Sequence, residues 1–207
     1  MSTDHWYAMP RLEGRLIQLR PLVAEDVDGY LAAAGAEAEE VFRWLRSPGS
    51  ASGAPRTADD ARLDVDAALA ARARGERFAY AQIDAATGEF AGTTSYYEVH
   101  PALRTLGIGH TWLGRRWWRS GHNTESKLLL LTHAFDTVGA ARVVWHTDIH
   151  NERSQAAIAR LGATREGEFP KHRIRRDGSW RTTVQFAMTD DDWPAARERL
   201  TERLARG

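Results

Sequence analysis

The sequence contains no cysteine among its 207 residues. Disulfide bonds, thiolate metal sites and cysteine nucleophiles are therefore excluded. No apolar run is long enough to span a bilayer. The first ten residues, which include Asp4, His5 and Trp6, lack the apolar core of a signal peptide. We therefore expect a cytoplasmic protein that does not engage a membrane.

Net charge is also absent, because 28 Lys and Arg residues balance 28 Asp and Glu residues. A balanced chain has no overall positive field to attract a polyanion, so nucleic acid is not the expected partner. The hydrophobic content of 43% suits a globular core. The length fits one domain over residues 1–207 and is short for two.

Hydrophobic periodicity and turn residues predict an alternation of strands and helices. The three middle strands form an antiparallel meander, and the passage from 106 to 148 is typical of a parallel crossover. Asp177 and Gly178 mark the turn of a final hairpin. The expected strands are 15–19, 78–83, 90–99, 106–113, 142–148, 164–174 and 181–188, and the expected helices begin near 24, 57, 124, 152 and 190.

The segment 112–125 joins a strand, a loop and the strongest predicted helix. Gly121 permits close approach of the backbone to a ligand, and Arg119 adds positive charge. The N-terminus of a helix presents unpaired N–H groups that suit a phosphate. The alternative is an ordinary strand-to-helix turn, since one glycine before a helix is a weak motif.

The segment 147–163 repeats this arrangement. A strand ends near Asp148, Asn151 is a suitable N-cap, and Ser154 lies at the third helical position. Leu161-Gly162-Ala163 then ends the short helix. The alternative is that Asn151 and Ser154 only cap this helix.

Together, the two segments resemble the GCN5-related N-acetyltransferases (GNAT), and more narrowly their RimJ/RimL-like branch. The resemblance extends from Arg15 to about Asp192. The matching stretches are LEGRLIQLRPL, IGHTWLG, RSGHNTESKLLLLTHAF and TDIHNERSQAAIARLGATREG. It implies one α/β domain with a mixed, splayed sheet of about seven strands. It also implies acetyl-CoA as co-substrate in a notch between the strands ending at Leu113 and Asp148, and N-acetylation of a primary amine.

The resemblance implies roles for particular residues. Ser154 matches a serine that some relatives are thought to use to protonate the leaving thiolate, and Asn151 lies beside it. No tyrosine lies in 164–174, where many relatives have their proton donor. The pyrophosphate loop departs from the family pattern, because Trp118 and Asn123 occupy two of its positions. The implied cofactor-binding residues are Trp112, Leu113, Arg119, Ser120, Gly121, His122, Asn123, Thr124, Asn151 and Arg153.

The amine arrives as an ammonium ion, so the reaction requires a proton acceptor. Glu98, His110 and His146 are the candidates, each with the alternative of a solvated or hydrogen-bonded side chain. Trp44, Tyr96 and His146 are expected to contact the acceptor amine. The loop 47–55 would border the entrance to its pocket.

Three further patterns allow more than one interpretation. His146, Asp148 and His150 alternate along a strand as metal ligands could, but nothing else marks a ligand shell, so no metal is expected. Gly107 and Gly109 lack the third glycine of a nucleotide loop. The basic run 171–176 is interpreted as a solvated edge, with a landing site for ribosomal RNA or an acidic peptide as the alternative.

Several points stay open at this level. The acceptor is either a protein N-terminus, as in ribosomal proteins, or a small amine. The transferred group is acetyl or a longer acyl chain, and a homodimer is one of the open oligomeric states. A non-catalytic acyl-CoA-binding module is the alternative function.

Overall fold

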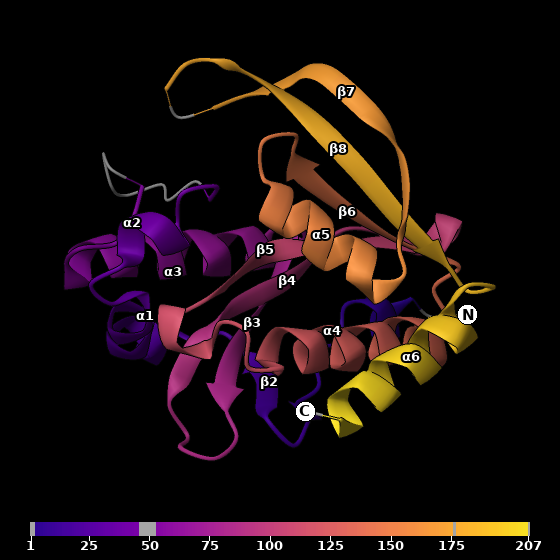
Figure 1. The fold of residues 1–207 in the computed structure, drawn as a ribbon. Coiled ribbons are helices and arrows are strands. Elements are labelled where there is room, and N and C mark those ends of the chain that lie inside the picture. Colours follow the sequence, from indigo (N-terminus) through magenta and orange to yellow (C-terminus); the bar gives the residue numbers. More distant parts are fainter. Residues whose placement is uncertain (1–2, 46–52, 176, 207) are drawn as a thin grey trace.

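One mixed sheet runs through the chain (Figure 1). A computed structural model describes residues 3–45, 53–175 and 177–206. Within them, eight strands lie in the order β1-β2-β3-β4-β5-β6-β8-β7. All neighbours are antiparallel except β5 and β6. The strands are β1 (Leu12–Glu13), β2 (Ile17–Pro21), β3 (Arg77–Asp84), β4 (Phe90–His100), β5 (Thr105–Leu113), β6 (Arg142–Asp148), β7 (Thr164–Ile174) and β8 (Trp180–Thr189).

This sheet confirms the predicted α/β fold, its antiparallel meander and its parallel crossover. It has eight strands where about seven were expected, because the two-residue β1 pairs with β2 and carries no periodicity of its own. The first predicted strand, 15–19, lies at 17–21 in the structure. Pro21 is compatible with this position because it is the last residue of the strand.

Six α-helices flank the sheet in the described ranges. The N-terminus of α4 lies at His122, two residues earlier than predicted, because Gly121 is its N-cap at φ 83°. The chain continues beyond α4 as a π-helix over His133–Val138. The helices are α1 (Val27–Ala34), α2 (Ala38–Val41), α3 (Ala58–Ala73), α4 (His122–Thr132), α5 (Glu152–Leu161) and α6 (Trp193–Ala205).

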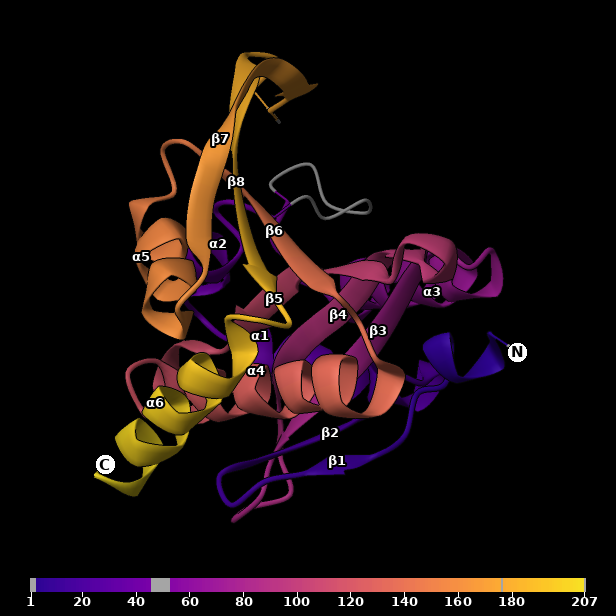
Figure 2. The same cartoon turned by 90° about the vertical axis from the view of Figure 1, so that its right-hand side faces the viewer.

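Two hydrophobic cores lie on opposite faces of the sheet. Strand β3 shows the alternation, since Phe78 and Tyr80 belong to one core and Ala79 and Ala81 to the other. The first core packs α4, α5 and α6 against the sheet, and Figure 2 shows α4 beside α6. The second core lies under α1 and α3.

The helices α1 to α3 cover only part of their face. Among the described residues, the second core includes none from β6, β7 or β8. The side chains of these strands on that face are largely polar or partly exposed, as with His146, Gln185 and Phe169. The β7–β8 hairpin rises from the body beside this uncovered face (Figure 1). We call this surface the open face.

Glu125 in the first turn of α4 fixes the start of β2. It is 7% exposed. Its carboxylate accepts hydrogen bonds from the backbone N–H groups of Arg15 at 3.0 Å, Leu16 at 2.6 Å and Ile17 at 2.9 Å. A carboxylate near a helix N-terminus is also favoured by the helix dipole. The contact therefore joins the edge of the sheet to the helix that begins at Gly121.

We predict that Glu125→Ala lowers the free energy of unfolding by roughly 3 kcal/mol, because three backbone donors lose their acceptor. Urea unfolding followed by circular dichroism measures the change. Glu202→Ala on α6 is the control, since this exposed glutamate bonds only to Arg206 in the next turn, and its loss should cost less than about 0.5 kcal/mol. Equal effects of the two substitutions would contradict the assigned role.

Candidate active site

The sheet opens where β5 leaves β6. The two strands pair at Thr105–Arg142, Leu106–Val143 and Gly107–Val144, and there the pairing ends. Strand β6 stays paired with β8 as far as Asp148. Strand β5 stays with β4, but with a register shift beside His110, whose φ is 49°. Such a bulge bends the strand, so a notch opens between the carboxyl ends of β5 and β6.

Helix α4 begins at one side of this notch. Its N-cap Gly121 has left-handed backbone geometry, and a Cβ there would lie 2.9 Å from Cδ1 of Leu16. No side chain caps the helix. The first-turn N–H groups of His122, Asn123 and Thr124 therefore have no partner within the helix. Such a helix start suits a phosphate group, as the sequence predicted for this loop.

Asp84, at the end of β3, anchors the loop before α4. Its carboxylate accepts hydrogen bonds from Nε1 of Trp117 at 2.7 Å and Nε2 of His122 at 3.1 Å. Burial opposes its ionisation, but these bonds and two from backbone N–H groups lower the pKa of Asp84 to about 2. Ser120 Oγ lies 2.9 Å from the other nitrogen of His122. The sequence analysis missed Asp84, because no local pattern links it to a loop more than thirty residues away.

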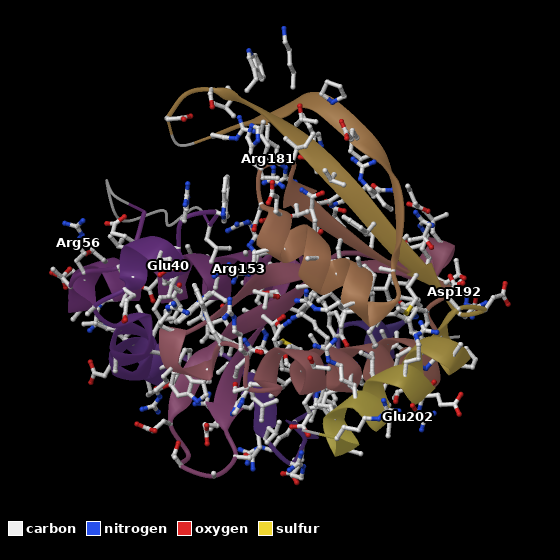
Figure 3. All side chains as sticks on the ribbon, in the orientation of Figure 1. Glu40, Arg56, Arg153, Arg181, Asp192 and Glu202 are labelled. Atoms are coloured by element: carbon white, nitrogen blue, oxygen red, sulfur yellow. The ribbon has the colours of Figure 1, made fainter. Side chains whose placement is uncertain are left out.

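The loops after β5 and β6 meet at the mouth of the notch. The guanidinium of Arg153, in the first turn of α5, lies 3.8 Å from the ring centroid of Trp118. Arg115 lies 4.4 Å from the same ring and 3.5 Å from Glu40. Figure 3 shows Glu40 and Arg153. Two cations thus stack on one indole at the place where the sequence predicted a cofactor.

Helix α5 begins at the other side of the notch. Asn151 is its N-cap, and its side chain accepts a hydrogen bond from the backbone N–H of Ser154 at 3.1 Å. Ser154 is half-buried. The predicted cap is therefore present. The predicted chemical role of Ser154 stays a prediction.

The three predicted proton acceptors, one of which is His146, lie together on the open face. Nε2 of His146 lies 2.9 Å from Oε1 of Gln185, and its Nδ1 lies 3.0 Å from the hydroxyl of Tyr97. Glu98 Oε2 is 3.8 Å from Nδ1. Because the Gln185 oxygen only accepts, Nε2 donates to it, and in the neutral ring Nδ1 then accepts from the hydroxyl of Tyr97.

His110 completes this group, which we call the His146 cluster: Tyr97, Glu98, His110, His146 and Gln185. The His110 ring meets Tyr97 edge to face, with centroids 5.6 Å apart. Partial desolvation and the nearby cations Arg77 and Arg173 lower the pKa of His110. Its imidazole is solvent-accessible and is neutral at pH 7. Burial raises the pKa of Tyr97, so its hydroxyl keeps its proton.

Gly107 and Gly109 lie under the ring of Tyr97. A Cβ at either position would approach ring atoms to 2.7 or 2.8 Å. The two glycines therefore make room for the tyrosine that bonds to His146. Their spacing of two on a strand could have indicated such a close contact on one face.

The remaining predicted site residues lie elsewhere. Tyr96 is 3% exposed and donates a hydrogen bond to the carbonyl of Leu130 in the core, on the sheet face opposite Tyr97. Trp112 packs under α1 against Tyr30, and Leu113 is buried beside it. Trp44 is half-buried near the guanidinium of Arg43. Residues 46–52, most of the loop predicted to border the acceptor, lie outside the described residues.

Asp148 does not join His146 and His150 in a metal site. It is 5% exposed and accepts two hydrogen bonds from Arg175, at 2.7 and 3.0 Å. Burial raises its pKa, but these bonds outweigh burial, so the net pKa is lowered. Nowhere in the described ranges do three or more His, Asp or Glu side chains gather as metal ligands.

Lys127 is a buried amine beneath the bulge of β5. It lies on α4 and is 4% exposed. Its Nζ donates to Oγ1 of Thr94 at 2.8 Å and to Oγ1 of Thr111 at 2.9 Å. Neither partner is charged, so burial lowers the pKa of Lys127 to about 7. The sequence analysis also missed this residue, because its partners come from two strands that are distant in sequence from its own helix.

A family comparison identifies the class of protein. A sequence model of the acetyltransferase (GNAT) domain matches residues 15–164, and the chain belongs to that family. Members of this family are N-acetyltransferases, and the family uses acetyl-CoA. In the described part of the chain, no helix is long and apolar enough to cross a membrane.

Individual relatives agree with this assignment. The chain is 27% identical to the [ribosomal protein uS5]-alanine N-acetyltransferase of Escherichia coli K12 over 60% of this chain and 63% of that protein, so it spans less than two thirds of that relative. A GCN5-related N-acetyltransferase structure from Brucella melitensis superposes with TM-score 0.87 at 29% identity, covering 95% of this chain and 86% of that one. Mycobacterium smegmatis RimJ, solved with CoA-disulfide, shares the fold with TM-score 0.78 at 23% identity over 96% of both chains.

We predict that Lys127 makes stability depend on pH. Its folded pKa lies below the value of about 10.4 in an unfolded chain. The unfolded chain therefore binds more protons between pH 7 and 10, and the free energy of unfolding rises across this range. Lys127→Met should be more stable than wild type at pH 7, on the order of 1–3 kcal/mol, with the gain shrinking toward pH 10.

Urea unfolding at pH 7, 8.5 and 10 measures this difference. Lys171→Met is the matched control, since Lys171 is exposed on β7 and is the only other lysine in the sequence. Its difference from wild type should not vary with pH. A difference for Lys127→Met that is the same at all three pH values would show that the pKa of Lys127 does not change on folding, and would contradict the prediction.

Proposed function

We propose that this chain transfers an acetyl group from acetyl-CoA to the N-terminal amine of a peptide or protein. One observation carries the proposal: β5 leaves β6 at a notch, and a helix begins at each side of it. The notch lies between the uncapped helix start at Gly121 and the His146 cluster. Acetyl-CoA has phosphates at one end and a reactive thioester at the other. The helix start suits the phosphates, and the His146 cluster suits the chemistry at the thioester.

The residues at the helix start suit the phosphates of coenzyme A. Gly121 leaves the backbone without a Cβ, and the first-turn N–H groups of α4 are free of a side-chain cap. Asp84 holds the loop through Trp117 and His122. Arg119, exposed just before Gly121, and Arg153, stacked on Trp118, add positive charge. When bound, acetyl-CoA supplies the acetyl group as an activated thioester.

The His146 cluster suits proton removal from the acceptor. The ammonium nitrogen loses two protons on the way to the amide: one before it attacks the thioester, and a second as the amide forms, which balances the proton taken up by the departing sulfur. Glu98 is partly exposed, lies 3.8 Å from His146 and can take the first proton directly or through water. The hydrogen bonds to Gln185 and Tyr97 fix the orientation of His146. Holding amine and thioester together supplies much of the rate.

Breaking the C–S bond requires a proton to reach the departing sulfur. Ser154 lies in the first turn of α5, beside the end of β6, and is half-buried. The side chain of Asn151 accepts a hydrogen bond from the backbone N–H of Ser154. This bond fixes the position from which the hydroxyl projects. We assign this donation to Ser154, with Asn151 as its positioning residue.

A peptide is favoured over a small amine as the acceptor. Among the described residues, no helix packs into a core on the open face at β6, β7 or β8, and the β7–β8 hairpin borders this face. The Escherichia coli relative is named for the alanine of a ribosomal protein. An extended peptide can lie along exposed strands, so the N-terminus of a ribosomal protein is the acceptor we propose.

Calorimetry with acetyl-CoA, followed by thiol release over a panel of peptides and small amines, tests the function. We predict that Gly121→Val weakens acetyl-CoA binding at least tenfold, because a branched side chain at φ 83° is strained and meets Leu16. Gly75→Val is the matched control, since Gly75 has φ 73° but open space around it. This control should lose stability and keep its affinity. Binding without thiol release from any amine would indicate a non-catalytic module.

For Ser154→Ala we expect a fall in kcat of roughly tenfold or more, with the affinity for acetyl-CoA nearly unchanged. Steady-state thiol release gives kcat, and calorimetry on the same preparation gives the affinity. The two readings separate proton donation from cofactor binding. If kcat stays at the wild-type value, Ser154 only forms part of the cap, and another group or water protonates the sulfur.

A further inference from the structure

Two arginines face each other across the β7–β8 hairpin. Arg173 and Arg181 are directly opposite in the register of the two strands. Like charges directly opposite one another destabilise a strand pair. Each positive charge disfavours the other. Desolvation lowers the pKa of Arg181 most, and the charge of Arg173 lowers it further. This pair is costly unless an anion lies beside it.

The described part of the chain does not supply that anion in full. Arg173 is exposed and has no ion-pair or hydrogen-bond partner among the described residues. Arg181 has a buried Nε without a hydrogen-bond partner there, and it lies 3.9 Å from Asp148. Asp148 is already bound by Arg175 through two short hydrogen bonds. Of these three hairpin arginines, Arg175 is paired by Asp148, whereas Arg173 and the Nε of Arg181 are unsatisfied.

Both unsatisfied arginines belong to the open face. Arg181 is on the same side of β8 as Gln185, which bonds to His146. Arg173 and Arg181 each lie close enough to Tyr97 to act on its pKa in the lowering direction, against the larger effect of burial. Figure 3 shows Arg181 at the hairpin, above the sheet. The pair therefore lies on the same surface as the His146 cluster.

Aromatic side chains connect the two places. The ring of Phe169 lies 6.4 Å from His146 and 5.5 Å from His172, and Phe169 is 41% exposed. His172 is also exposed, with its ring 6.3 Å from His146. The three rings therefore form a triangle, and His172 directly precedes Arg173 in the chain. Exposed rings of this kind suit contact with a chain that lies on the surface.

The spacing selects the kind of ligand. Arg181 is four residues along β8 from Gln185, which is roughly 13 Å of strand. This is the separation of the two backbone positions. A free amino acid, with its amine and carboxylate on one carbon, is far shorter. An extended peptide advances about 3.3 Å per residue. Because the side chains span part of the distance, an acidic residue at the second to fourth position would reach the pair.

We propose that Arg173 and Arg181 bind a carboxylate of the acceptor peptide, so that the enzyme prefers N-termini with Asp or Glu at positions two to four. The proposal rests on the function proposed above and specifies its substrate. Arginine forms paired hydrogen bonds with a carboxylate. Two adjacent guanidinium groups therefore favour an acidic residue over its amide, and they repel a basic residue.

Matched peptides test this preference. The series has the same N-terminal residue and length, with Asp at position two, three or four, or Asn or Lys at the same place. Thiol release gives kcat and KM for each peptide. We expect kcat/KM to be at least tenfold higher for one Asp peptide than for its Asn partner, mainly through KM. Arg173→Gln should remove this ratio, and Arg173→Glu should shift the preference to the Lys peptide.

Arg203→Gln is the control, since it removes one exposed arginine from α6 at the other end of the molecule, and it should keep the preference. Equal kcat/KM for Asp and Asn peptides in the wild type overturns the inference and leaves the acetyltransferase function intact. A free amino acid used as well as the Asp peptide overturns it too, because the spacing argument then fails. If the wild-type protein neither binds acetyl-CoA nor releases thiol, the proposed function is wrong, and the inference that rests on it is wrong with it.

Discussion

The early end of pairing between β5 and β6 is the constraint on which the rest of this molecule depends. Only three residue pairs join the two strands. If the ladder continued, the sheet would close over the notch between Leu113 and Asp148, where we propose that acetyl-CoA binds. The bulge at His110 keeps β5 with β4 instead and turns its carboxyl end aside. Both helices that begin at the notch owe their placement to this separation.

Separation of the strands leaves polar groups near the interior, and the structure satisfies them from a distance. Asp84 reaches the loop before α4 from the end of β3. Lys127 reaches Thr94 and Thr111 on β4 and β5 from α4. Asp148 holds Arg175 of the hairpin. Each contact joins two different elements. Together they hold the loop before α4, the strands β4 and β5 at the notch, and the hairpin beside it.

The sequence predicted the features that depend on local chemistry. Gly121 and Asn151 were recognised because a glycine or an asparagine before an amphipathic helix has a known local geometry. The order of strands and helices followed from periodicity. The cluster around His146 also included three residues that were named as proton acceptors. Their assembly in one place could not be derived, because it requires the register of β4, β5, β6 and β8.

The choice between neighbouring tyrosines shows the limit. Tyr96 was predicted at the acceptor site, but it points into the core, and Tyr97 faces His146. A shift of one residue exchanges the two faces of a strand, and Glu98 and His110 both have left-handed backbone geometry that no periodicity reveals. Lys127 and Asp84 were missed for a related reason. Their partners are set by tertiary packing over many residues of chain.

The glycines beneath Tyr97 have a consequence for how this chain can diverge. Gly107 and Gly109 are adapted to one large ring, and that ring is adapted to His146. An alanine at either glycine displaces the tyrosine, and a smaller residue at 97 leaves a void and an imidazole nitrogen without its donor. Acceptable variants must therefore alter β4, β5 and β6 in concert. The four positions are therefore physically coupled, so that a change at one is expected to need a compensating change at the others.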